Sequence, residues 1–272
     1  TSLEGIKFLE NLALEDKKRI FFNFQLRFSK INEILKQYLN SEKVGKLIQI
    51  NIIASMGFAF KEKYIGSWRA DGKNNLHNII ENVSIHWIDL MIFNFGKSIA
   101  ASYFPRLMSN HGSSYDTNSL ILKFENGITV SIFNSYATPL IEDVVVIGTN
   151  SFVTIRDNAI ETFSPRDTFN ENGLFTKPKN RTQTEFSFES NVNHALKSSV
   201  DYFLEHVKNY VEGEDWEIYL NKIYQSNEIS AEPLFLKFFK ISMKDFNSYE
   251  IFVKIIEFLE GEKGGSLEGI IP

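Results

Sequence analysis

The sequence predicts an α+β protein in which helices cover one face of a predominantly antiparallel, open β-sheet. Six short strand-like segments follow one another between residues 98 and 163, and turn dipeptides such as Asn126-Gly127 separate them. Segments with apolar residues at helical spacing flank this region on both sides. Because consecutive hairpins produce antiparallel pairing and one apolar sheet face needs a cover, the helices are expected to supply that cover.

Composition narrows the class of protein. The 272 residues include 43% hydrophobic and 14% aromatic residues, which is typical of a chain that folds around a core. The net charge is -5 and the basic residues form no stripe, so nucleic acid is not an expected partner. No apolar run reaches the ~18 residues of a membrane span. The absence of cysteine indicates a reducing, cytoplasmic setting, and no histidine has metal-ligand spacing, so no metal is predicted.

The N-terminal part alternates helix and strand. Residues Ser2 to Arg19 have helical spacing, and the apolar run Ile20 to Phe28 is typical of a buried strand. Ser29 is expected to cap a helix that ends near Leu39, and a strand is predicted from Lys46 to Phe58. Helix then strand is therefore the expected order before the sheet.

A helix from Asn78 to Phe95 is predicted to end at Gly96. The six strands that follow are expected at residues 98–104, 118–124, 128–136, 142–147, 152–156 and 159–163. Residues 164–185 form a polar loop in this prediction. Two amphipathic helices, Val192 to Val211 and Trp216 to Ile229, are then expected on the sheet, and an apolar helical tail begins at Pro233.

The segment Ser67 to Leu90 carries the candidate substrate site. On an ideal helix Asn82, His86 and Asp89 share one face, because their spacing is i, i+4 and i+7. An imidazole can take a proton from a sugar hydroxyl at neutral pH, and an amide can orient that hydroxyl. A core histidine bonded to the backbone is the alternative for His86. Asp89 orients the imidazole or caps a local network, and Glu81 could replace Asn82 if the helix register slips.

Four further side chains are candidates for substrate binding. Arg69 has the planar fork that binds carboxylate or phosphate through two nitrogens, and Asp71 can pair with it. Trp68 can stack on a sugar ring, with a place in the core as its alternative. Arg166, in the long loop, is a second candidate for an anion contact, with a surface ion pair as its alternative.

The order of these motifs resembles the C-terminal half of the Gfo/Idh/MocA family of NAD(P)-dependent sugar oxidoreductases, over roughly Ser2 to Ser230. Trp68-Arg69-Ala70-Asp71 is similar to the family's W-R-x-D motif. The stretch from Asn82 to Asp89 is similar to its D-x-G-x-H-x-x-D motif, although two of the four marked positions differ. Further similarities lie at Arg27, Gly45-Lys46-Leu47, Asp116, Asn126-Gly127 and Ile147 to Ser151.

The resemblance implies a substrate-binding and oligomerisation half, with His86 as acid and base in hydride transfer between NAD or NADP and a sugar or nucleotide sugar. Residues 1–28 would be the remnant of a dinucleotide-binding domain, residues 29–230 the substrate domain and residues 231–272 a helical tail of unknown role. The sequence contains neither G-x-G-x-x-G nor E-K-P, so this chain alone is expected to bind no cofactor and to be inactive. A homo-oligomer through the open sheet face is also implied.

Two other hypotheses remain open. The chain could be a non-catalytic carbohydrate-binding or scaffold module, because an amide at Asn82 stands where the family usually has an acid. Alternatively, a separately encoded nucleotide-binding domain could dock on the apolar segment Ile20 to Phe28 and restore activity.

Overall fold

The computed structural model describes residues 23–39, 44–165, 168–178 and 180–210. Seven helical elements and eight strands lie in this part of the chain. The helical elements are η1 (Gln25–Phe28), α3 (Lys30–Leu39), η2 (Phe58–Phe60), α4 (Glu62–Ile65), η3 (Ile80–Ser84), α5 (Ile85–Phe95) and α6 (Phe188–Tyr210). The strands are β1 (Leu47–Ser55), β2 (Ser98–Arg106), β3 (Thr117–Phe124), β4 (Thr129–Ser135), β5 (Ile141–Gly148), β6 (Phe152–Arg156), β7 (Ala159–Ser164) and β8 (Asn180–Glu185).

The eight strands form one open sheet in the order β2-β3-β4-β1-β5-β6-β7-β8. The six strands predicted between residues 98 and 163 are all present, and consecutive strands pair antiparallel as expected except β4 and β5, which do not pair with each other. β1 separates β4 from β5 and runs parallel to β4. β1 therefore lies at the centre of the sheet, and the segment that follows it leads toward the site.

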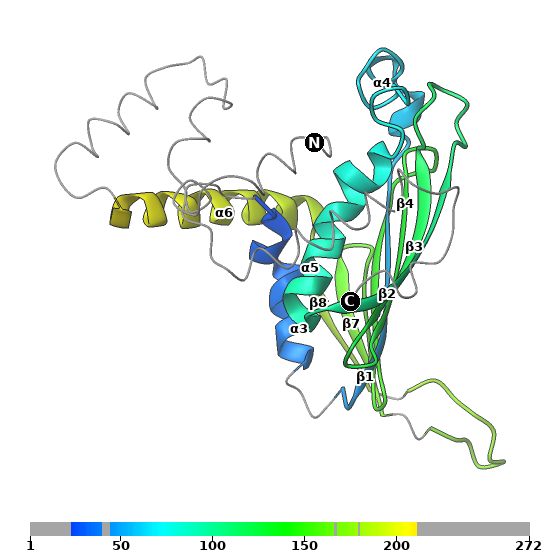
Figure 1. Ribbon diagram of the computed structural model, residues 1–272. Coiled ribbons are helices and arrows are strands. Elements are labelled where there is room, and N and C mark those ends of the chain that lie inside the picture. The colour runs from blue at the N-terminus through cyan, green and yellow to red at the C-terminus, as the bar shows by residue number, and fades with distance from the viewer. Residues whose placement is uncertain (1–22, 40–43, 166–167, 179, 211–272) are drawn as a thin grey trace.

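Helices cover one face of this sheet, as predicted, and the other face carries no layer of described residues (Figure 1). Alternation along the strands places Ile50 and Ile52 of β1 on the covered face, where they are fully buried. They join one core with Ile88 and Met91 of α5 and with residues of α3. The opposite face leaves apolar side chains such as Ile121 exposed.

The predicted helix from Asn78 to Phe95 begins with a π-helical turn, η3, and continues as α5. Gly96 ends α5 with a positive φ of 78°, and its N–H donates to the carbonyl of Ile92. Such a conformation favours glycine, so the predicted stop is confirmed. A π turn inserts one residue into the helical path, which changes the direction of every side chain before Ile85 relative to those after it.

Two predicted segments differ from the structure. None of the described residues of the predicted strand Ile20 to Phe28 is in a strand, because Gln25–Phe28 form the 3-10 helix η1, which packs on α5 and α6; residues 20–22 lie outside the described part. An apolar run of this length is compatible with a strand or with a buried turn. The predicted loop at residues 164–185 ends in a strand, β8, which pairs with β7 at the sheet edge. Its polar sequence NRTQTE suits a solvated edge strand and hides the strand pattern.

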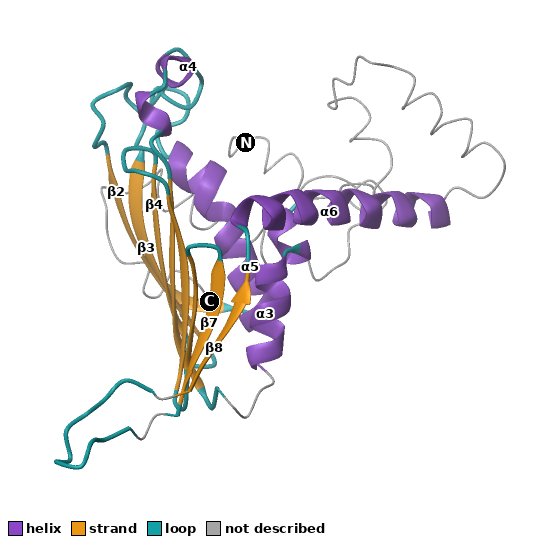
Figure 2. Cartoon of the chain, turned by 180° about the vertical axis from the view of Figure 1, so that it is seen from behind, coloured by secondary structure: helices purple, strands orange, loops and turns teal. Residues whose placement is uncertain are grey.

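The helices that cover the sheet are α3 and α5, whereas α6 packs mainly on η1 and extends beyond the sheet (Figure 2). The predicted apolar stripe of α6 is therefore only partly covered: Leu196 and Val200 are exposed, and the small residues Ala195 and Ser199 are buried instead. The predicted helices Ser2 to Arg19 and Trp216 to Ile229 and the tail from Pro233 lie outside the described residues. In the described part of the chain, no helix has both the length and the apolar character to cross a membrane.

Candidate functional site

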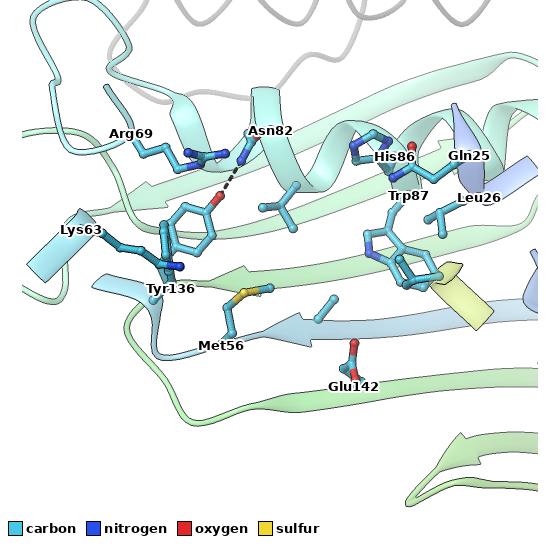
Figure 3. Close-up of a pocket in the computed structure, with 14 residues that line it drawn as sticks. Gln25, Leu26, Met56, Lys63, Arg69, Asn82, His86, Trp87, Tyr136 and Glu142 are labelled. Atoms are coloured by element: carbon cyan, nitrogen blue, oxygen red, sulfur yellow. Dashed lines mark hydrogen bonds between the residues drawn. The ribbon is translucent and has the colours of Figure 1, made fainter. Parts of the chain in front are cut away.

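A pocket of about 590 Å³ lies between the sheet and the helical layer, at the end of the sheet that carries α4 (Figure 3). This volume is within the range of small-molecule sites. Arg69, Asn82 and His86, which the sequence proposed as one site, all line it. The structure therefore brings together three residues that come from a loop, the π turn and α5.

Arg69 lies on the loop between α4 and η3, with its guanidinium near two aromatic rings. Its guanidinium carbon is 4.4 Å from the centroid of the Trp68 ring and 5.8 Å from that of Phe58. Stacking covers the faces of the planar group and leaves its edge donors available. Trp68 does not line the pocket and is 51% exposed, so in this structure it supports Arg69 rather than the core.

Asp71, predicted to bind substrate, is a turn residue outside the pocket lining. Its carboxylate accepts hydrogen bonds from the Asn74 amide at 2.6 Å and from the backbone N–H of Lys73 at 3.0 Å. The hydrogen bond from Asn74 is the main reason that the pKa of Asp71 lies below its usual value. Asp71 thus shapes the loop that carries Arg69. Arg166, the other predicted anion contact, lies outside the described residues.

Asn82 lies in the π turn and its amide nitrogen donates to the hydroxyl oxygen of Tyr136 at 2.8 Å. The charge of the Arg69 guanidinium acts on this phenol. Burial raises the pKa of Tyr136, and Asn82 and Arg69 oppose that rise. Because Asn82 donates to the phenolic oxygen, the phenol's own hydrogen remains available for an acceptor in the pocket.

A buried polar network holds the π turn on the sheet. The Ser84 hydroxyl donates to the Asn134 side-chain oxygen at 2.6 Å, and the Asn118 amide donates to Ser84 at 3.0 Å. The Asn134 amide nitrogen continues to the carbonyl of Ala54 in β1 at 2.8 Å. Ser84, Asn118 and Asn134 are all fully buried, so the network fixes the π turn, and with it Asn82, against β3, β4 and β1.

His86 lies in the first turn of α5 and faces the pocket. Burial lowers the pKa of His86, so the imidazole is neutral at neutral pH. Its Nδ1 is buried and has no hydrogen-bond partner among the described residues. Phe24 packs against the ring edge-on, with 6.4 Å between centroids. A neutral imidazole at a pocket wall can accept a proton from a bound hydroxyl.

Asp89 lies one turn further along α5, outside the pocket lining. Its two carboxylate oxygens accept hydrogen bonds from Arg27 Nε at 2.8 Å and from Arg27 Nη2 at 2.6 Å. The Asp89 side chain is 0% exposed and that of Arg27 12% exposed. The carboxylate therefore connects η1 to α5. Such a local network was the alternative to a role of Asp89 in orienting His86.

Three further pocket residues are absent from the sequence-based site: Lys63 of α4, Tyr136 after β4 and Glu142 of β5. Alternation along β5 could have identified Glu142, because it shares the covered face with the buried Val144 and Val146. Burial raises the pKa of Glu142. Tyr136 and Lys63 have no such signal in the sequence. Glu81, considered as a substitute for Asn82, does not line the pocket.

Part of the chain matches the description of a known domain family. Residues 33–154 match the description GFO/IDH/MocA C-terminal domain. A comparison with curated proteins found no match.

Three solved structures share the fold. An oxidoreductase from Thermotoga maritima is 15% identical with a TM-score of 0.62, over 98% of this chain and 67% of that one. An oxidoreductase from Agrobacterium radiobacter, in complex with NAD+, L-tartaric acid and magnesium, is 19% identical with a TM-score of 0.51, over 83% and 59%. Levoglucosan dehydrogenase in complex with NADH and levoglucosan is 10% identical with a TM-score of 0.53, over 67% and 55%.

The chain thus spans 55 to 67% of the length of these three proteins. At 10 to 19% identity, the similarity to these structures establishes the fold alone, an α+β sheet domain with one helical layer. The matched residues run from α3 to β6 and include most of the pocket. Residues 33–154 are therefore similar to the C-terminal domain of the Gfo/Idh/MocA family.

Proposed function

We propose that this chain provides the substrate site of an NAD(P)-dependent oxidoreductase that acts on a hydroxyl carbon of a sugar or nucleotide sugar. The observation that carries the proposal is the common pocket of Arg69, Asn82 and His86. Such convergence of a neutral base with several hydrogen-bonding groups suits a polyhydroxylated ligand. Known structures with the same fold, in complex with levoglucosan or with L-tartaric acid, support this substrate class.

In this proposal His86 takes the hydroxyl proton as the carbon is oxidised, and returns it in the reverse direction. Its low pKa keeps the ring neutral before the transfer. Tyr136 donates its phenolic hydrogen to a substrate oxygen, because its own oxygen already accepts a hydrogen bond from Asn82. Asn82 and Tyr136 therefore orient the substrate, and His86 moves the proton.

The cofactor is assigned to a dinucleotide-binding domain and not to the described residues. These residues present no glycine-rich turn between a strand and a helix that could hold a pyrophosphate. A nicotinamide, when bound beside the pocket, would accept the hydride.

A binding experiment with the 272-residue chain tests the substrate site. Glucose, myo-inositol and UDP-glucose are titrated calorimetrically, and the histidine ring resonances are followed by NMR. The signal that disappears in His86→Gln should shift on binding, whereas that of the exposed His194 should not. Asn82→Leu should weaken binding about tenfold, because the ligand and Tyr136 lose an amide partner. Failure of every polyol to bind, or binding without any shift of His86, contradicts the proposal.

A non-catalytic carbohydrate-binding module is the second candidate, favoured by the amide at Asn82, whose hydrogen bond to Tyr136 gives it a purely orienting role. Titration of the chain with NADH, followed by nicotinamide fluorescence, tests whether the chain alone binds the cofactor. The proposed assignment of the cofactor to another domain predicts no change in fluorescence. If NADH binds and a polyol is oxidised by the chain alone, the module hypothesis and this assignment are both wrong.

A further inference from the structure

The pocket is electrically asymmetric along its length. Two cations, Lys63 and Arg69, lie at one end with Asn82 and Tyr136, whereas Glu142 lies toward the other end with His86 and Gln25 (Figure 3). Both cations adjoin the same ring, because Lys63 Nζ is 5.4 Å and the Arg69 guanidinium carbon 5.8 Å from the centroid of Phe58. The positive charges therefore act on the same part of the pocket.

Neither cation has a carboxylate partner among the described residues. Three of the four other arginines in this part of the chain do, the exception being Arg106: Arg27 pairs with Asp89, Arg156 with Asp143 and Arg181 with Glu161. Arg69 instead stacks on Trp68, and its charge acts on the phenol of Tyr136, whose pKa it lowers. A guanidinium held by ring stacking keeps in-plane N–H donors for an anion, with which it forms two parallel hydrogen bonds.

We propose that the substrate carries an anionic group, a carboxylate or a phosphate, and that Arg69 and Lys63 bind it at the α4 end of the pocket. This inference rests on the proposed function, because it names the class of polyol that the same site takes. The opposite end sets the orientation. Glu142 repels an anion there whenever it is ionised, and the hydroxyl-bearing part of the ligand then lies beside His86.

The same arrangement predicts that a neutral sugar binds more weakly than an anionic one. Binding a neutral hydroxyl at the cationic end would leave Arg69 and Lys63 without a counter-charge while displacing their water. An anion compensates both charges, and hydrogen bonds to charged groups are stronger than those between neutral groups. The preference should also weaken as salt rises, because the exposed Lys63 is screened.

The test compares glucose, gluconate and glucose 6-phosphate by calorimetric titration of the 272-residue chain at low and high salt. At least one of the two anions should bind about tenfold more tightly than glucose at low salt. The gluconate and glucose 6-phosphate arms distinguish a carboxylate from a phosphate as the group recognised.

Arg69→Gln should remove most of this preference and Lys63→Met part of it. Lys61→Met is the matched control, because Lys61 is an exposed lysine two residues away that does not line the pocket. The exposed position of Lys63 keeps this arm informative even if Arg69→Gln disturbs the loop.

Two outcomes would overturn the inference, and they differ in what else they overturn. If glucose binds as tightly as both anions, or if Lys61→Met and Lys63→Met lower the preference equally, the anion site is wrong while the polyol site stands. If none of the three compounds binds and the polyols of the preceding section also fail, the proposed function falls together with the inference.

Discussion

The ion pair between Arg27 and Asp89 should be the most costly single contact to remove near the site. The Asp89 side chain is fully buried and accepts two hydrogen bonds from a guanidinium that is only 12% exposed. Arg27 also lies over the rings of Phe24 and Phe93, at 5.4 and 4.9 Å from their centroids. Asp89→Asn removes the negative charge that contacts this poorly hydrated guanidinium through two oxygens.

Breaking a buried pair by changing one partner costs about 3 to 5 kcal/mol, because an uncompensated charge stays buried. We therefore expect Asp89→Asn to lower the free energy of unfolding in urea by about that amount. The double variant Arg27→Met with Asp89→Leu removes both charges and keeps the apolar contacts. It should recover most of the loss, which a double-mutant cycle measures as a coupling energy.

The same variants separate two roles of Asp89. If the carboxylate oriented His86, Asp89→Asn would change the titration of that ring with little effect on stability. A loss of less than 1 kcal/mol in Asp89→Asn, or a double variant as unstable as the sum of the single variants, would refute the structural account of the pair.

Three further predictions concern the pocket itself. Since burial lowers the pKa of His86 from 6.5, the unfolded chain takes up the proton first as pH falls. The free energy of unfolding should therefore decrease below pH 6.5, by up to about 1.4 kcal/mol per pH unit. Urea titrations at several pH values should show that His86→Gln removes this contribution and that His194→Gln does not. Tyr136→Phe leaves the Asn82 amide without its acceptor and should cost about 1 to 3 kcal/mol of unfolding free energy, measured in urea; no loss would show that water replaces the phenol. Ser84→Ala breaks the buried network that holds the π turn and should lower stability by about 1 to 3 kcal/mol and weaken polyol binding in calorimetry, whereas unchanged binding would separate the network from the site.

The regular part of the fold follows from local sequence patterns. Alternating apolar residues between residues 98 and 163, with turns at Asn126-Gly127 and Asp157-Asn158, predict six strands that the structure contains. Positive φ angles at Asp157, Asn158 and Gly127 are the reason that these residue types occupy the turns. Both signals come from a few neighbouring residues, so they can be recognised without knowing how the rest of the chain folds. The polar edge strand β8 lacks them and was predicted as loop.

For the site, the sequence by itself selected seven candidate residues through side-chain chemistry, helical spacing and resemblance to family motifs, and three of them, Arg69, Asn82 and His86, line the pocket. Only the tertiary structure decided what each one meets. The insertion of β1 between β4 and β5 brings Glu142 to the wall of the pocket and supports the π turn through Asn134. The partner of Asp89 likewise comes from Arg27, which is 62 residues away. Long-range pairing depends on how strands and helices pack across the whole sheet, and a periodic pattern within one segment contains no information about that packing.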